Sequence, residues 1–418
     1  MYQTTQESQV YLRGRFRAQN GYVAMSSWPH YDEEQISAVT AVLRSGKGNY
    51  WSGTECREFE REYASYLGRR HAIAIANGTV ALELALEAFC IGEGDEVIVP
   101  ARTFVASASC AVMRGCVPVV VDIDRDSQCI TADEIERAIT PRTKAVIVVH
   151  LAGWPCDMGS ILKVADAHGL YVIEDCAQAH GAFYKGRPIG SMGHAAAFSF
   201  CQDKIMTTGG EGGLLVLDDE TAWKRAWAYK DIGRSYDAVF QPQNGSGIHF
   251  RWLIESFGTN WRMTEMQAAI GRIQLRRLPD WVEKRRSNAE RLRNAMHDLP
   301  AVRCPWPASH IEHAFYKFYA FVEPQQLRGG WSRDRILSEI EKAGVPCGVG
   351  SCSEIYLEKA FADRGWGPST RLPVARELGE CSMMFQVHPT LTDNDLLRTT
   401  TVLREVLSRA GDRSLAAA

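Results

Sequence analysis

From about residue 70 the chain repeats one pattern: a short apolar run rich in β-branched residues, a turn, and then a stretch with helical spacing. Strands that alternate with helices in this way form a parallel sheet with crossover helices on its faces. Most runs are apolar at successive positions, as strands covered on both faces must be. The predicted strands are 71–76, 96–99, 117–122, 145–150, 171–174, 195–200 and 213–217, and the predicted helices are 80–89, 104–113, 132–139 and 161–168.

After Asn260 the pattern changes to long helical stretches over 264–278 and 281–296. Pro279 is expected to separate them, because proline removes a helical donor and clashes with the preceding turn. Mixed elements follow, including 318–322 and 333–343. This organisation predicts an α/β protein with a large, mostly parallel sheet that carries helices on both faces, and a smaller α+β domain. The predicted boundaries are a polar tail over 1–24, the large domain over 25–280 and the small domain over 281–418.

The composition excludes several classes of function. The 418 residues carry 47 Lys and Arg against 50 Asp and Glu, with no long run of one sign, so no nucleic-acid surface is expected. No segment approaches the roughly 20 apolar residues that span a bilayer. The 12 cysteines include no CxxC pair at zinc spacing, so we expect no metal and predict reduced thiols in a cytoplasmic protein.

Ligands of open α/β sheets bind beyond the carboxyl ends of the strands, so the residues that follow each predicted strand are candidates for a site. Asn77-Gly78-Thr79 follows the first strand and opens a helix. Backbone N–H groups and a hydroxyl at such a position can hold a phosphate. An ordinary strand-to-helix turn is the alternative interpretation.

Two further strand ends carry chemically useful side chains. Asp175 follows the strand 171–174, and Gln178 lies three residues later. The carboxylate can cap a helix or form a structural salt bridge, or it can keep a pyridinium nitrogen protonated and so make that ring an electron sink. Lys204 lies on a glycine-rich loop before the strand 213–217. It is either a solvated lysine or a desolvated amine that forms a Schiff base with an aldehyde.

Four motifs occur together in this chain. They are Asn-Gly-Thr-Val-Ala-Leu at 77–82, Glu-Asp-Cys-Ala-Gln at 174–178, Phe198-Ser199-Phe200 with Lys204 five residues after the serine, and Gly-Thr-Asn-Trp-Arg-Met at 258–263. Their order and spacing resemble the DegT/DnrJ/EryC1/StrS family of sugar aminotransferases, over a span from Trp28 to about Val406. The resemblance implies the fold type I aminotransferase architecture, pyridoxal 5′-phosphate as the cofactor and a homodimer with shared active sites.

The resemblance also implies a role for each site residue. Lys204 would form the internal aldimine and move the proton between cofactor and substrate. Asp175 would pair with the pyridine nitrogen, Gln178 would contact the phenolic oxygen, and Phe104 would stack on the ring. The phosphate would be held by Gly78, Thr79, Ser199 and Asn260, the last of these from the neighbouring subunit. A turn residue before the next helix is the alternative interpretation of Asn260.

Lys204 also bears on the type of reaction. The sugar dehydratases of this family carry histidine at this position, so the lysine implies ping-pong transamination. The implied donor is L-glutamate or L-glutamine, and the implied acceptor is a nucleotide-linked 4-keto-6-deoxy or 3-keto hexose. Alternatives are an aminotransferase of a keto-cyclitol of the scyllo-inosose type and an aminobenzoate-synthase-like enzyme.

Two other classes are weighed against this one. An NAD-linked oxidoreductase would need a GxGxxG motif after the first strand, and neither that motif nor a P-loop is present. A non-catalytic regulator with the same fold would not need Lys204 and Asp175.

Substrate contacts are less defined by the sequence. Candidates for lining a sugar pocket, with packing as the alternative, are Trp51, Trp154, His180 and His313. Candidates for a diphosphate, with a surface or interface position as the alternative, are Arg234, Arg251 and Arg262. The segment 348–352 departs from the family pattern, and substrate choice is expected to depend on it.

Overall fold

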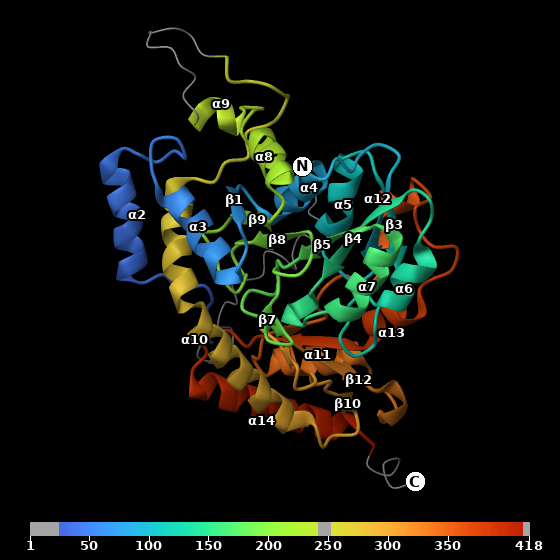
Figure 1. Ribbon diagram of the computed structural model, residues 1–418. Helices are drawn as coiled ribbons and strands as arrows, with labels where there is room; N and C mark the ends of the chain where they lie inside the picture. The colour runs from blue at the N-terminus through green and yellow to red at the C-terminus, as the bar shows by residue number, and fades with distance from the viewer. Residues whose placement is uncertain (1–24, 241–251, 413–418) are drawn as a thin grey trace, which may run out of the picture.

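The computed structural model describes residues 25–240 and 252–412, so the predicted tail over 1–24 lies outside the described residues. Its centre is a seven-stranded sheet with strand order β1-β9-β8-β5-β4-β2-β3 (Figure 1). Strands β3, β2, β4, β5 and β8 run parallel, whereas β9 lies antiparallel between β8 and β1. This confirms the large, mostly parallel sheet. The strands are β1 (His71–Ile75), β2 (Glu96–Pro100), β3 (Val117–Val121), β4 (Thr143–Val149), β5 (Tyr171–Asp175), β8 (Ala195–Ser199) and β9 (Gly213–Leu217).

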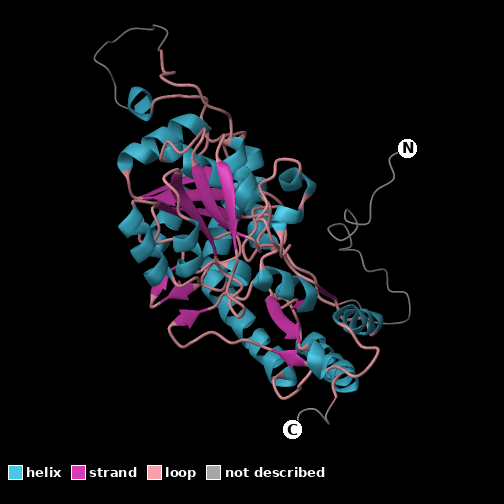
Figure 2. Ribbon diagram, turned by 90° about the vertical axis from the view of Figure 1, so that its right-hand side faces the viewer, coloured by secondary structure: helices cyan, strands magenta, loops and turns pink. Residues whose placement is uncertain are grey.

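Helices cover this sheet from both sides, as Figure 2 shows. The sheet is apolar on both faces because both are buried: Val97, Ile147 and Val172 have no exposed surface. Burial of this apolar area is the main favourable term in folding. The helices that pack on the sheet are α3 (Glu55–Leu67), α4 (Gly78–Ala88), α5 (Ala106–Met113), α6 (Ala132–Ala138), α7 (Met158–His168) and α8 (Glu220–Lys230).

Helix α10 (Glu265–Met296) is one continuous helix of 32 residues that includes Pro279. The predicted break at Pro279 is therefore wrong. Both halves of the helix are held by packing: Gly271 lies against Phe59 of α3, and Asn288 donates to the carbonyls of Val387 and His388 at 3.2 Å. Tertiary contacts on both sides outweigh the lost backbone donor. The boundary expected at residue 280 falls inside α10, and the division into two domains stays a prediction.

A second sheet has four antiparallel strands in the order β10-β12-β14-β13. A hairpin of β6 and β7 pairs with β11, and Lys185 and Gly186 form its turn with φ angles of 50° and 75°. The strands are β6 (Phe183–Tyr184), β7 (Arg187–Pro188), β10 (Val302–Arg303), β11 (Ile311–Glu312), β12 (Phe318–Val322), β13 (Cys347–Gly348) and β14 (Ser382–Phe385).

The remaining helices complete the described chain. They are α2 (Glu33–Ser45), α9 (Tyr236–Phe240), α11 (Arg333–Lys342), α12 (Lys359–Ala362), α13 (Pro373–Cys381) and α14 (Asp393–Ala410), with single helical turns at Leu151–Gly153, Pro324–Gln326 and Ile355–Leu357. Among the helices within 25–240 and 252–412, none combines the length and the apolar character that crossing a lipid bilayer requires.

Candidate active site

The start of helix α4 lies directly against Ser199. Helix α4 begins at Gly78, and the side chain of Asn77 caps it by accepting a hydrogen bond from the Val80 N–H at 3.0 Å. A Cβ at Gly78 would lie 2.6 Å from the Ser199 Cβ, so the close approach depends on glycine. The first N–H groups of a helix have no partner inside the helix. Those of Gly78 and Thr79, together with the two hydroxyl groups of Thr79 and Ser199, are therefore available to an anion.

Asp175 presents a buried carboxylate at the end of β5. The residue is 6% exposed, its Oδ2 accepts from the Ser107 hydroxyl at 2.8 Å, and its Oδ1 accepts from the Ala177 N–H at 3.1 Å. Burial raises the pKa of this carboxyl above its usual value, while the two hydrogen bonds and the charge of Lys204 act in the opposite direction. Each carboxylate oxygen has a second lone pair, so Asp175 can accept a further hydrogen bond from a ring nitrogen.

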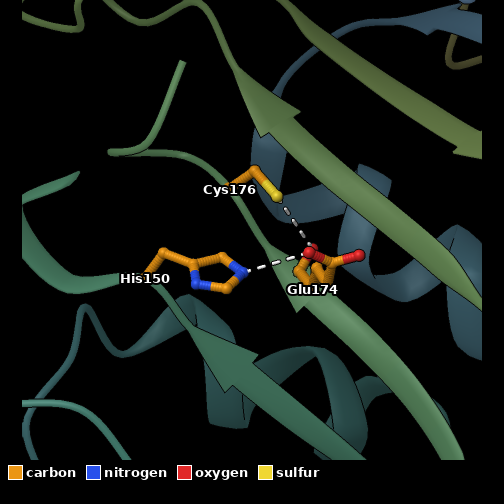
Figure 3. Close-up of side chains that lie close together, drawn as sticks. All are labelled: His150, Glu174 and Cys176. Carbon is orange, nitrogen blue, oxygen red and sulfur yellow. Dashed lines mark hydrogen bonds and ion pairs between the residues drawn. The ribbon is translucent and has the colours of Figure 1, made fainter. Parts of the chain in front are cut away.

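A cluster of His150, Glu174 and Cys176 lies beside the end of β5, fully buried (Figure 3). The potential ligand atoms lie within 4.8 Å of one another, as in a metal site. Glu174, however, accepts hydrogen bonds from three backbone N–H groups of segment 190–193 and pairs with His150 Nε2 at 3.2 Å. The Cys156 N–H donates to His150 Nδ1 at 3.0 Å, so Nε2 carries the proton and offers no lone pair to a metal.

The charge of Glu174 is stabilised by the same bonds. Burial opposes the charge, but the hydrogen bond from His150 and those from the backbone N–H groups of Gly193 and Gly190 outweigh it and hold the pKa of the Glu174 carboxyl below its usual value. The cluster therefore works as a hydrogen-bonded support that fixes the end of β5.

Gln178 is held by the loop that follows β4. The Ala152 N–H donates to Gln178 Oε1 at 2.7 Å, so the NH₂ group is the end of the amide that can donate to a phenolic oxygen. Ala152 has a φ of 57°, a left-handed conformation that is uncommon outside glycine. Its carbonyl accepts from the Tyr316 N–H at 2.8 Å, which joins this loop to the segment before β12.

Lys204 lies on the loop between β8 and β9 and is half-buried. Its Nζ lies 5.0 Å from the ring centre of Tyr316, and its carbonyl accepts from the Trp28 indole N–H at 2.8 Å. The Tyr316 hydroxyl donates to the carboxylate of Asp203, the residue before Lys204. The lysine side chain is thus held against an aromatic ring and is not extended into solvent.

Phe104 and Asn260 lie at the accessible side of the site. Phe104 precedes α5 and is 51% exposed. Asn260 is exposed, and its backbone forms a bridge to Asp231. The carbonyl of the next residue, Trp261, accepts from the Ala76 N–H at 2.8 Å, so this segment lies beside the end of β1. A single chain leaves both side chains open to contact with another molecule.

The residues considered for a sugar pocket take part in packing. His180 has no exposed surface, and its two ring nitrogens pair with the Tyr63 hydroxyl at 2.8 Å and the Ser199 carbonyl at 2.9 Å. Trp154 and His313 pack edge to face with 5.4 Å between their ring centres. These contacts favour the packing alternative for His180, Trp154 and His313, and Trp51 likewise packs edge to face on Trp227 with 5.9 Å between the ring centres.

The arginines considered for a diphosphate are paired within the chain. Arg234 and Arg262 both form ion pairs with the fully buried Asp231, and Arg234 also lies over the Trp51 ring at 5.1 Å. Their guanidinium groups balance a buried carboxylate. Arg251 lies outside the described residues.

Three residues near the site did not stand out in the sequence: Ser107, Tyr316 and Lys317. Lys317 Nζ lies 4.7 Å from the Tyr316 ring centre and donates to Gln386 at 3.0 Å. Burial, aided by neighbouring positive charges and opposed by Asp203, lowers the pKa of Lys317 to about 8. A lysine inside the apolar and aromatic run 315–322 was the available signal.

These groups fit pyridoxal phosphate. The start of α4 and two hydroxyls suit a phosphate, the buried carboxylate of Asp175 suits a pyridine nitrogen, the amide of Gln178 suits a phenolic oxygen, and the amine of Lys204 suits an aldehyde. All four kinds of group belong to segments that meet at the carboxyl ends of β1, β5 and β8.

Comparison with known proteins decides the family. The profile of the DegT/DnrJ/EryC1/StrS aminotransferase family matches residues 29–404. The chain belongs to this family. Relatives of this aminotransferase include the spore coat polysaccharide biosynthesis protein SpsC of Bacillus subtilis, 33% identical over 393 residues that cover 92% of this chain and 97% of SpsC. The dTDP-3-amino-3,4,6-trideoxy-alpha-D-glucose transaminase of Streptomyces venezuelae is 34% identical over 376 residues, which cover 90% of this chain and 93% of the transaminase.

Solved structures share the fold of this aminotransferase. An aminotransferase from Psychrobacter cryohalolentis is 52% identical, with a TM-score of 0.89 over 92% of this chain and 99% of that one. A 3-amino-5-hydroxybenzoic acid synthase is 29% identical, with a TM-score of 0.81 over 92% and 99%. The putative sugar aminotransferase Spr1654 of Streptococcus pneumoniae is known in a PLP form and a PMP form. The PLP form is 27% identical, with a TM-score of 0.81 over 93% of this chain and 99% of that one. The fold type I architecture and pyridoxal 5′-phosphate as the cofactor are thereby confirmed.

Gly78→Ala should weaken cofactor binding by this aminotransferase. The added Cβ would lie 2.6 Å from the Ser199 Cβ, so the start of α4 or the end of β8 must shift, and the phosphate donors must shift with it. We expect the affinity for pyridoxal phosphate to fall about 10- to 100-fold, measured by titration of the apoprotein. Gly48→Ala is the matched control, because nothing lies within 4 Å of a Cβ at Gly48. Equal affinities of the two variants would contradict the assignment.

Proposed function

We propose that this aminotransferase moves an amino group from L-glutamate or L-glutamine to a keto-sugar by ping-pong transamination. The proposed acceptor is a nucleotide-linked 4-keto-6-deoxy or 3-keto hexose. The observation that carries the proposal is the position of Lys204, on a loop at the end of the sheet where Asp175 is buried. A lysine amine at this position would bind the cofactor reversibly, as transamination requires.

The chain's own side chains have separate tasks in this proposal. When bound, pyridoxal phosphate supplies the electron sink that stabilises negative charge at the reacting carbon. Asp175 would keep the pyridine nitrogen protonated, and Lys204 would move the proton between the reacting carbon of the substrate and the cofactor. Gln178 orients the ring through its phenolic oxygen, and Phe104 covers one face of the ring. The phosphate is held by Gly78, Thr79 and Ser199, and by Asn260 of a second subunit.

The proposed acceptor is supported by relatives and by one contact in this chain. A dTDP-sugar transaminase is among the relatives, which favours a nucleotide-linked hexose. Likeness to the 3-amino-5-hydroxybenzoic acid synthase keeps an aminobenzoate-synthase-like reaction as the second candidate, beside transfer to a keto-cyclitol of the scyllo-inosose type. The Thr103 N–H donates to the Cys352 carbonyl at 3.2 Å, so the segment 348–352 lies beside Phe104. This position supports a role of the segment in substrate choice.

We also propose a homodimer with shared sites, located in the cytoplasm. Large apolar side chains near Asn260 are exposed in the single chain: Trp252 is 86% exposed, Ile254 52% and Phe257 98%. Such a patch favours contact with another protein surface. Together with the exposed Phe104, it supports a second copy that completes the site. All twelve cysteines are free, which supports a reducing compartment.

Visible absorption of the purified protein tests the reaction without a sugar substrate. With pyridoxal phosphate added, we expect a visible band that bleaches on addition of L-glutamate or L-glutamine and returns when a keto acceptor is supplied. D-Glutamate is the matched control and should leave the band unchanged. A band that neither donor bleaches would refute the proposed donors, and a protein that forms no band would refute the role of Lys204.

A further inference from the structure

Two hydroxyl groups form a chain behind Asp175. The Ser107 hydroxyl donates to Asp175 Oδ2 at 2.8 Å, and the Thr103 Oγ1 lies 2.7 Å from the Ser107 Oγ. Thr103 is 1% exposed and Ser107 is fully buried, so water does not compete for these bonds. A buried bond to a charged group is stronger than a bond between neutral groups.

The ionised carboxylate decides the direction of both bonds. An ionised carboxylate only accepts, so the single hydroxyl proton of Ser107 points to Asp175. The oxygen of Ser107 then accepts the proton of Thr103. The backbone holds both residues in place, because the Thr103 N–H donates to the Cys352 carbonyl at 3.2 Å and the Ser107 N–H donates to the Phe104 carbonyl at 3.1 Å.

We propose that Ser107, supported by Thr103, is a positioning residue that fixes the orientation and the negative charge of Asp175 for the ring nitrogen of the cofactor. The inference rests on the role proposed for Asp175 and extends it to two residues that act through that carboxylate.

The charged groups around Asp175 show why a neutral donor is needed. Burial disfavours the ionised carboxylate, and the positive charge of Lys204 favours it. Lys204 is also the group that would bind the cofactor, and the ring of His150 is engaged by Glu174. Burial raises the pKa of the Cys110 thiol, which faces Asp175 from α5, well above its usual value, so this group stays neutral. The bond from Ser107 is present in every charge state of these neighbours.

The test is the pH dependence of pyridoxal phosphate affinity, measured by titration of the apoprotein. The ionised carboxylate binds the protonated ring, so affinity falls as the pH drops through the pKa of Asp175. Loss of the Ser107 hydroxyl removes a bond to the charged form and raises that pKa. For Ser107→Ala we expect the acidic midpoint to move up by about one pH unit, and for Thr103→Val by about half as much. The phosphate of the cofactor titrates equally in all variants.

Controls separate this role from a merely structural one. Ser107→Thr keeps the hydroxyl and should restore the wild-type midpoint, and Ser109→Ala, on the same helix, should leave it unchanged. A wild-type midpoint in folded Ser107→Ala would overturn the inference, and if that variant does not fold, a wild-type midpoint in Thr103→Val, which preserves side-chain shape, would do so. Asp175→Asn should leave only the acidic limb that the phosphate contributes, and adding Ser107→Ala to it should not move that limb further. If Ser107→Ala still shifts the midpoint in the Asp175→Asn background, the shift does not act through Asp175 and the inference fails; if Asp175→Asn alone leaves the wild-type midpoint and affinity, the proposed role of Asp175 fails.

Discussion

Lys204→Ala should abolish both transamination and the visible band of the cofactor-loaded protein, and it should leave the fold intact. The side chain packs against the Tyr316 ring from a loop, while the hydrogen bond from Trp28 uses the Lys204 carbonyl, which alanine retains. The variant loses the group that binds the cofactor covalently and moves the proton. We expect turnover to fall by about 10⁴-fold or more, measured as amino transfer from L-glutamate.

The exposed Lys144 on β4 provides the control, and Lys144→Ala should keep full activity. Near-wild-type turnover of Lys204→Ala would show that another residue binds the cofactor and moves the proton.

Co-expression of Lys204→Ala chains with Asn260→Ala chains extends the test to the dimer. If Asn260 reaches into the partner's site, a mixed dimer contains one site with Lys204 and Asn260 both intact, and partial activity returns.

Asp175→Asn is expected to give the second largest loss. Asparagine has the same shape, so it can keep one hydrogen bond from Ser107 or Ala177, but it has no charge to hold the pyridine nitrogen protonated. An unprotonated ring is a poorer electron sink, and we expect kcat to fall about 100- to 1,000-fold with weaker cofactor binding. Asp219→Asn is the matched control, because asparagine caps a helix as well as aspartate does and Asp219 caps α8. Equal kcat values for these two variants would contradict the assignment.

The fold was largely predictable because its strands are defined by local patterns. β9 begins and ends at the residues predicted for a strand, 213–217, and the element expected over 318–322, whose type was left open, is strand β12. The antiparallel direction of β9 was not predicted. It follows from the short connection after β8: residues 200–212 form no helix, and parallel neighbouring strands need a long crossover connection, usually a helix. The predicted helix break at Pro279 was wrong for a different reason. A local rule for proline cannot include the packing of α10 against α3 and α14.

The candidate site was predictable only where its residues sit in local motifs. Gly78 follows β1 and Asp175 ends β5, and positions at a strand end can be read from the sequence. Tyr316 reaches Asp203 across 113 residues, and Ser107 reaches Asp175 across 68. Neither pair has a spacing that a sequence pattern could indicate, because the fold alone brings them together.

The antiparallel strand β9 affects the order in which the sheet can form during synthesis on the ribosome. β1 has one neighbour in the sheet, β9, and Ile75 pairs with Gly213. The strands β2 to β5 can pair while synthesis proceeds, but β1 must wait until β9 has left the exit tunnel. Closing so long a loop is slow. The first turn of α4 and the Lys204 loop therefore meet late, and a nascent chain that ends before β9 has no assembled place for the vitamin B6 coenzyme.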